Sequence, residues 1–230
     1  MKKARQLMIE WSAGHGGARK GAGRRRVASR RRVSHKGRPD LKGSLPIHVT
    51  CRLREGLPSL RNRETALLVM ACLARACERV GFRLVEYSIQ GNHLHLICEA
   101  EDREALSKAM QVLLSVLARC LNRHWGRRGS VFEDRYHADV LTTPTQCRNA
   151  LCYVLHNAKK HGTRPRRSGA DPYSTAPWFD FTNHPSPRKD RKPASAPETW
   201  LLRSGWHRGG PLYQQSHPRP PNPKSKVHPT

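Results

Sequence analysis

The chain has 230 residues, of which 43 are Lys or Arg and 17 are Asp or Glu, so its formal net charge is +26. This length suits one domain of moderate size with additional segments. No apolar stretch has the length of a transmembrane helix, and the N-terminus lacks the hydrophobic run of a signal peptide, which argues against membrane insertion and secretion. The seven cysteines include no Cys-x-x-Cys pair, which favours reduced thiols in a cytoplasmic protein over disulfides or a zinc site.

The positive charge is concentrated at the two ends of the chain. The net charge is +12 over residues 1–44, +6 over residues 45–162 and +8 over residues 163–230. Blocks of like charge repel one another and bury little apolar surface. We therefore expect a disordered basic arm, a folded domain, and a basic, Pro-rich and mostly disordered tail, in that order. Short aromatic stretches of the tail are candidates for docking: Trp178, Phe179, Phe181, Trp200 and Trp206.

The excess of basic residues indicates a polyanionic partner, and nucleic acid is the commonest one. An anionic membrane surface is the alternative, but no amphipathic stretch accompanies the charge. Contacts from the arm to DNA phosphates would position the nucleic acid without reading its sequence. The arginines expected to make these contacts are Arg24, Arg25, Arg26, Arg30, Arg31 and Arg32.

The first half of the domain predicts a strand, a helix and two more strands. Residues 47–53 alternate between apolar and polar, as in a half-buried strand. Residues 63–80 carry apolar residues at helical spacing, and Gly81 is the expected C-cap. Residues 82–90 and 93–99 predict two strands joined by a tight Gly-Asn turn.

The second half predicts a long helix, a strand and a final helix. An amphipathic helix is expected over 101–125, then a Gly/Arg loop over 126–129 and a fourth strand over 136–141. The final helix should span 144–161, because Thr143 is a good N-cap and is followed by Pro and then Gln at the third helical position. The order of elements predicts an α+β ferredoxin-like sandwich, an antiparallel sheet with two helices on one face, plus an appended C-terminal helix.

The strand over 93–99 contains a His-Leu-His sequence. Alternation places His93 and His95 on one face of the strand, and Leu94, Leu96 and Cys98 on the other. Two imidazoles about 7 Å apart along a strand are close enough to bind one divalent cation. Two polar residues on a solvated strand face are the plainer interpretation of this pair alone.

The final helix has a tyrosine and an asparagine outside its apolar stripe. The stripe consists of Cys147, Leu151, Val154 and Ala158. Tyr153 and Asn157 are i and i+4, so their side chains are neighbours on the helix surface. Packing of the stripe does not explain this pair, although a tyrosine partly covering the domain surface is common.

Three segments together resemble the single-tyrosine HUH transposases, in particular REP-associated tyrosine transposases and insertion-sequence transposases. They are His93-Leu94-His95, the segment Gly-Ser-Val-Phe-Glu-Asp-Arg-Tyr over 129–136, and the segment Tyr-Val-Leu-His-Asn-Ala-Lys-Lys-His-Gly over 153–162. HUH denotes His-hydrophobic-His. The resemblance covers about residues 45–162 and neither end of the chain.

The resemblance implies a metal-dependent endonuclease and strand transferase acting on single-stranded DNA. His93, His95 and Asn157 would ligate Mg²⁺ or Mn²⁺, with His156 ranked second to Asn157 as the third ligand. Tyr153 would be the nucleophile and would form a 5′-phosphotyrosine, in DNA transposition or in the processing of repeats. The family usually has Pro after the Asn, where this chain has Ala158; this change affects the exact placement of the helix.

Further DNA contacts are expected from arginines of the domain. Arg127, Arg128 and Arg135 follow the long helix, and solvated arginines are the equal alternative for them. Arg52 shares a face of the first strand with His48, and both could face DNA. The DNA partner implied is single-stranded and hairpin-forming, in a bacterial, nucleoid-associated setting, with a homodimer left open.

Two other functions stay open at this point. One is a non-catalytic nucleic-acid-binding protein on the same fold, although the strands lack the aromatic motif of an RNA-recognition domain. The other is a replication-initiator or relaxase-like nicking enzyme, a class that normally has larger or additional domains.

Overall fold

The computed structural model describes residues 41, 43–160, 170–182, 187–213 and 216, with the side chains of 158–160 excepted. The basic arm, including the six arginines expected to contact DNA, lies outside the described residues apart from its last few positions. None of the described helices is both long and apolar enough to cross a membrane.

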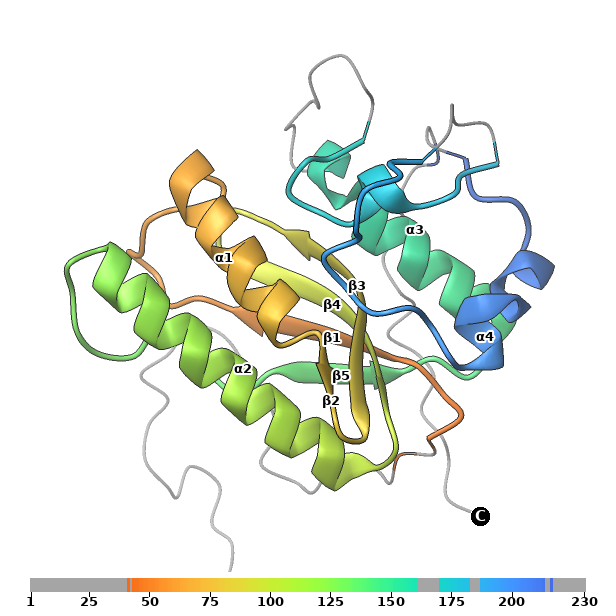
Figure 1. Cartoon of the computed structure of the whole chain (residues 1–230), viewed down its shortest axis with the longest axis horizontal. Coiled ribbons are helices and arrows are strands. Elements are labelled where there is room, and N and C mark those ends of the chain that lie inside the picture. Colours follow the sequence, from red (N-terminus) through yellow and green to blue (C-terminus); the bar gives the residue numbers. More distant parts are fainter. Residues whose placement is uncertain (1–40, 42, 161–169, 183–186, 214–215, 217–230) are drawn as a thin grey trace, which may run out of the picture. The chain divides into compact units, whose positions relative to one another are not determined.

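The domain is built on one antiparallel sheet with the strand order β2-β3-β4-β1-β5 (Figure 1). The strands are β1 (Ile47–Arg52), β2 (Glu78–Arg79), β3 (Phe82–Ile89), β4 (His93–Ala100) and β5 (His137–Val140). The helices are α1 (Arg63–Arg75), α2 (Arg103–His124), α3 (Pro144–Lys160) and α4 (Trp200–Arg203), with short 3₁₀ helices η1 (Ala176–Trp178) and η2 (Gly205–Gly209). Leaving out the two-residue β2, the chain runs βαββαβ and then α3, so the predicted α+β ferredoxin-like sandwich with an appended helix is confirmed.

The two faces of the sheet pack against different helices. Leu94, Leu96 and Cys98 of β4 belong to a core shared with α1 and α2. Ile97, on the opposite face of the same strand, belongs to a second core shared with α3. Figure 1 accordingly draws α1 and α2 on one side of the sheet and α3 on the other. The period-2 alternation predicted for this strand therefore separates two cores.

The end of α1 differs from the prediction. The helix ends at Arg75, not near Val80, with Ala76 as its C-cap, and β2 follows almost immediately. The assignment of Gly81 as C-cap is therefore wrong. Gly81 has a φ of +69° in the tight turn between β2 and β3. A left-handed glycine suits a helix C-cap and a hairpin turn equally well, so its conformation alone does not distinguish them.

The predicted start of α3 is confirmed in detail. The Thr143 hydroxyl accepts a hydrogen bond from the Gln146 backbone N–H at 3.2 Å, as expected of an N-cap. Pro144 is the first helical residue. The Gln146 side-chain oxygen accepts from the backbone N–H of Thr142 at 2.9 Å and from its hydroxyl at 2.8 Å. These bonds fix where α3 begins and hence which of its side chains face the sheet.

Part of the C-terminal segment, residues 170–213, packs against α3 and the edge of β3. Its larger apolar residues that join the second core with α3 are Phe181, Leu201, Leu202, Trp206 and Leu212. The Ile89 N–H donates to the Tyr173 carbonyl at 2.9 Å, and the Thr175 N–H donates to the Tyr87 carbonyl at 3.1 Å. These bonds cover the part of the β3 edge that β2 is too short to pair.

The segment and the rest of the domain supply partners for each other's buried charges. Arg61 donates two hydrogen bonds to the buried Asp171 carboxylate, at 2.9 and 2.8 Å. Lys192 donates to buried Glu86 at 2.5 Å. Buried Glu99 accepts from the backbone N–H groups of Glu198 and Thr199. A buried charge without such partners is strongly destabilising, so these contacts favour the docked position of the segment.

Removal of the Phe181 ring should destabilise the whole domain. Phe181 is 3% exposed, and its ring lies 5.1 Å from that of His156 on α3. We expect Phe181→Ala to lower the free energy of unfolding by about 3–5 kcal/mol in urea denaturation, the usual cost of deleting a buried aromatic ring. The control Tyr213→Ala, at a ring in the same segment that is 42% exposed, should change it by less than about 0.5 kcal/mol. Equal effects of the two substitutions would contradict the described packing.

Candidate active site

The face of the sheet toward α3 carries a group of polar side chains around the predicted histidine pair. On β4, His93 and His95 lie on this face, as predicted from the alternation. Directly opposite His95 are Thr50 of β1 and Ser88 of β3, and directly opposite His93 is Arg52 of β1. Residues directly opposite one another in a sheet share a face. The strand pairing thus surrounds the two histidines with hydroxyl and guanidinium groups.

Four rings from three elements meet at this point. The ring centroids of His93 and His95 are 4.7 Å apart. The ring of Tyr153, on α3, lies 4.9 Å from that of His95 at an interplanar angle of 83°. The ring of His48, on β1, lies 5.3 Å from that of His95 and 5.9 Å from that of Tyr153. The tyrosine and the histidine pair, about 60 residues apart in sequence, are therefore side by side in one chain.

In both histidines of the pair, the Nδ1 atom is engaged by a neighbour. His93 Nδ1 lies 2.8 Å from the side-chain oxygen of Asn92, so it must be the donor and carry the proton. His95 Nδ1 lies 3.2 Å from the Thr50 hydroxyl oxygen and 3.3 Å from His48 Nε2. A cation would accordingly be ligated through Nε2 of each ring. Hydrogen bonds at the second nitrogen are the usual way in which a protein orients metal-ligating histidines.

Asn157 is fully buried one helical turn beyond Tyr153. Neither its amide oxygen nor its amide nitrogen has a hydrogen-bond partner among the described residues. A buried polar group without a partner costs about 1–3 kcal/mol and calls for an explanation. The sheet covers one side of α3 and the C-terminal segment packs against the helix as well. For this reason Asn157, although outside the apolar stripe, is not exposed to solvent.

His156, the other candidate for the third ligand, makes contacts within α3 and with the C-terminal segment. Its Nδ1 lies 3.0 Å from the Cys152 carbonyl oxygen, and its ring packs on Phe181 of the C-terminal segment. These contacts support its second rank behind Asn157 as a candidate ligand.

The two imidazoles of the histidine pair could hold a divalent cation together with a third ligand, and the side-chain amide of Asn157 is the candidate for that ligand. In the part of the chain that the structure describes, no group of three or more His, Cys, Asp or Glu residues could hold a metal ion. The histidine pair supplies two imidazoles, and the buried amide of Asn157 is an oxygen donor without another partner. A divalent cation of the Mg²⁺ or Mn²⁺ type accepts such mixed ligands and keeps positions for phosphate or water.

The sequence did not reveal that His48 and Thr50 are the neighbours of His95 Nδ1. His48 is 3% exposed and lies against His95, and a DNA-facing role for it stays a prediction. Burial lowers the pKa of His48 to about 4, an effect partly offset by Asp139 and reinforced by His137. At neutral pH His48 is therefore uncharged, and a hydrogen bond can form between its Nε2 atom and His95 Nδ1. Only the strand register, which alternation does not provide, places Thr50 opposite His95 and His48 opposite Ile97, two residues along on the same face.

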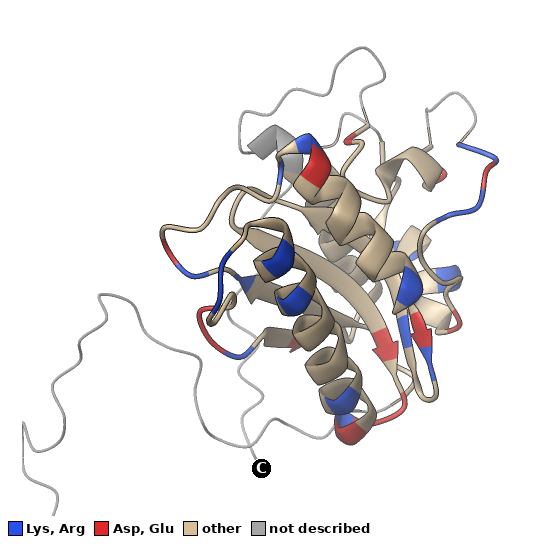
Figure 2. Cartoon of the chain, turned by 60° about the vertical axis from the view of Figure 1, so that its left-hand side comes forward, with Lys and Arg blue, Asp and Glu red and all other residues tan. Residues whose placement is uncertain are grey.

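The four arginines expected to contact DNA differ in their surroundings. Arg52 is exposed, lies opposite His93 and forms an ion pair with Glu133 at 3.5 Å. Arg127 donates to the side-chain oxygen of Asn122 at 2.9 Å, whereas Arg128 and Arg135 are exposed. Figure 2 shows Lys and Arg interspersed with Asp and Glu over the described elements. The strand register thus places Arg52 beside the histidine pair.

The central part of the chain is similar to a known protein family. A family model described as "Transposase IS200 like" matches residues 44–156, a stretch that contains His93, His95 and Tyr153 and ends one residue before Asn157. The search among curated proteins gave no match. A solved structure of a REP-associated tyrosine transposase bound to a REP hairpin is similar with 16% sequence identity and a TM-score of 0.49, over 62% of this chain and 82% of that chain.

Burial of His48 should make the stability of the protein depend on pH below neutrality. Between pH 6.5 and about 4 the unfolded chain binds a proton that buried His48 excludes. The contribution of His48 to the free energy of unfolding should therefore fall as the pH falls through this window, by on the order of 3 kcal/mol. Urea denaturation at pH 7.5 and 4.5, with chelator present, measures this difference.

A His48→Gln variant has no group that titrates at this position, so its stability should fall less over the same pH range. The matched control is His124→Gln, at an exposed histidine. An identical pH dependence of the parent and the His48→Gln protein would contradict the buried, neutral state of His48.

Proposed function

Because the central segment of the chain, residues 44–156, belongs to the family of IS200-like transposases, we propose that the protein is a DNA-cleaving and strand-joining enzyme with Tyr153 as its nucleophile. The observation that carries the proposal is the contact of the Tyr153 ring with His95, within a group that also holds His93. A tyrosine that only covered the domain surface would have no reason to lie against His95, whose Nδ1 atom is engaged by Thr50 and His48.

The proposed reaction is a transesterification on a single DNA strand. The Tyr153 phenolic oxygen attacks the scissile phosphorus and loses its proton. The bond between phosphorus and the 3′ oxygen breaks, and that oxygen takes up a proton to become a free 3′-OH. The 5′ phosphate stays on the tyrosine, so the phosphodiester energy is kept and a 3′-OH can reverse the step on the same or another strand. A phenoxide is a better leaving group than an alkoxide, which favours this joining step.

His93 and His95 would hold Mg²⁺ or Mn²⁺ through Nε2, and Asn157 through its amide oxygen. When bound, the ion supplies positive charge that polarises the scissile phosphate and helps to orient it. Thr50 and His48 fix the orientation of His95 through its Nδ1 atom. Arg52, exposed and opposite His93, is suited to bind a neighbouring phosphate of the strand.

The substrate proposed is single-stranded DNA with hairpins. Tyr153 is half-buried between α3 and the sheet, and a flexible single strand reaches such a position more easily than a rigid duplex. The strongly basic ends of the chain, together with Arg127, Arg128 and Arg135, would add affinity that falls steeply with salt. Because Tyr153 lies on His95 of its own chain, we propose a site built from residues of one chain.

Full-length protein incubated with Mn²⁺ and hairpin-bearing single-stranded DNA should form a covalent adduct that survives denaturing gel electrophoresis. Tyr153→Phe should abolish the adduct but keep the DNA affinity, because only the nucleophilic oxygen is lost. Thr50→Val removes a partner of His95 Nδ1 and should raise the Mn²⁺ concentration for half-maximal adduct formation by about tenfold or more. Retention of the adduct in Tyr153→Phe would contradict the proposal.

Mixing two inactive variants provides the control for a site built from one chain. A Tyr153→Phe protein and a His95→Ala protein should not restore the adduct when combined, because the tyrosine and the histidine come from the same molecule. Salt-sensitive DNA binding without an adduct under any metal would point instead to the non-catalytic alternative.

A further inference from the structure

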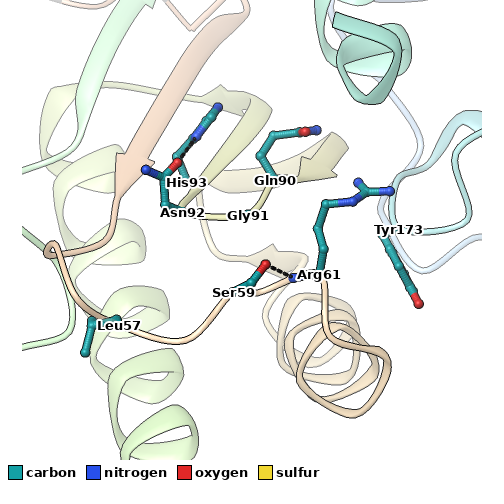
Figure 3. Close-up of a pocket in the computed structure, with 8 residues that line it drawn as sticks. All are labelled: Leu57, Ser59, Arg61, Gln90, Gly91, Asn92, His93 and Tyr173. Carbon is teal, nitrogen blue, oxygen red and sulfur yellow. Dashed lines mark hydrogen bonds between the residues drawn. The ribbon is translucent and has the colours of Figure 1, made fainter. Parts of the chain in front are cut away.

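A cavity beside the histidine pair has no role in the chemistry described above. It has a volume of about 530 Å³ and opens next to His93, which lines both the cavity and the candidate active site. Its other lining residues are Leu57, Ser59, Arg61, Gln90, Gly91, Asn92 and Tyr173, drawn in Figure 3. The volume is in the range of sites for small ligands. Whatever occupies it would lie directly beside a phosphate held at the histidines.

Gln90 gives the cavity an unsatisfied hydrogen-bond acceptor. The side chain is 1% exposed, and its amide nitrogen donates to the Ser88 hydroxyl at 2.7 Å. Its amide oxygen has no hydrogen-bond partner among the described residues. Figure 3 shows the side chain between His93 and Arg61. A buried acceptor in the wall of a cavity favours a ligand that presents an N–H donor.

Arg61 and Tyr173 form a rigid wall of the same cavity. The Arg61 guanidinium donates to the Ile89 carbonyl at 2.7 Å and to both oxygens of Asp171, and it lies 5.0 Å from the centroid of the Tyr173 ring. Because Asp171 neutralises its charge, Arg61 is not available as a phosphate-binding cation. The cavity thus offers an aromatic ring and an amide acceptor without net positive charge, and these features suit a nucleobase better than a phosphate.

We propose that this cavity binds one base of the single strand, next to the phosphodiester that is cleaved. The inference rests on the proposed function, since that function supplies the DNA strand. The base would pack against Tyr173 and donate an N–H hydrogen bond to the Gln90 amide oxygen. The backbone would pass His93 on its way to Tyr153. The C-terminal segment, which contributes Tyr173, would thereby take part in substrate binding, although it lies outside the region matched by the transposase family.

A binding measurement that requires no catalysis tests the cavity. Fluorescently labelled five-nucleotide strands of thymidine, deoxycytidine or deoxyadenosine are compared with a five-unit abasic strand of the same charge, at one salt concentration. The full-length Tyr153→Phe protein should bind the base-containing strands more tightly than the abasic strand, by about tenfold for a single stacked base. Charge-based binding by the basic ends cancels in this ratio.

Three substitutions in the same background decide whether the cavity produces the preference. Tyr173→Leu should remove most of it, Gln90→Leu should reduce it severalfold, and Tyr173→Phe should keep it because the ring remains. The control Tyr213→Leu, at an exposed ring outside the cavity, should leave it unchanged. Thermal unfolding of each variant identifies substitutions that simply prevent folding.

A parent protein without preference for bases, or an unchanged preference in both Tyr173→Leu and Gln90→Leu, would overturn the proposal. The two proposals fail separately. Loss of base preference in these variants, in a protein that never forms the covalent adduct with intact Tyr153, would leave the cavity assignment standing and contradict the enzymatic one.

Discussion

The alternation of side chains along β4 is the constraint on which the rest of the structure depends. Leu94, Leu96 and Cys98 close the core against α1 and α2, and this requires His93 and His95 to point to the other face. A shift of the strand by one residue would turn the histidines into the apolar core with α1 and α2 and turn the leucines to the face toward α3. The register of the candidate site is therefore set by hydrophobic burial on the far side of the sheet.

The second core sets the position of the tyrosine. α3 buries its apolar stripe against Ile97 and Val85, which lie on the same face as the histidines. Its start is fixed by the Thr143 N-cap, so the rotation of the helix places Tyr153 on His95. The C-terminal segment completes this core with Phe181 and other apolar residues, and it binds buried Glu86 and Glu99 on the same face. In this account the segment stabilises the docked position of the helix that bears the proposed nucleophile.

Local sequence patterns predicted the elements, because each depends on residues close together in the chain. The start of α3 followed from Thr143 and the residues after it, and the faces of β4 followed from alternation. The end of α1 was not predicted correctly, because a glycine with positive φ fits both a helix end and a hairpin turn. The pairing of Glu78 with Arg83 shows that Gly81 lies in a hairpin turn.

Features that depend on long-range packing were not predictable in the same way. The role of His48 depends on the register of β1 against β4, and its burial depends on α3 and β5. The packing of residues 170–213 contrasts with their basic, Pro-rich composition. The composition of this segment does not reveal that Asp171 pairs with Arg61 of the domain and that Lys192 pairs with Glu86. The resemblance to a family, and no local pattern, connects His93, His95, Tyr153 and Asn157 in one predicted site.

Identification of the residue that carries the DNA tests the central claim most directly. The covalent adduct would be digested with nuclease and protease, and its peptides sequenced by mass spectrometry. We predict a phosphorylated nucleotide remnant on Tyr153, attached through the 5′ phosphate, in the peptide that contains Asn157. A remnant on any other residue, such as Tyr136 or Tyr173, would contradict the assignment of Tyr153 as the nucleophile.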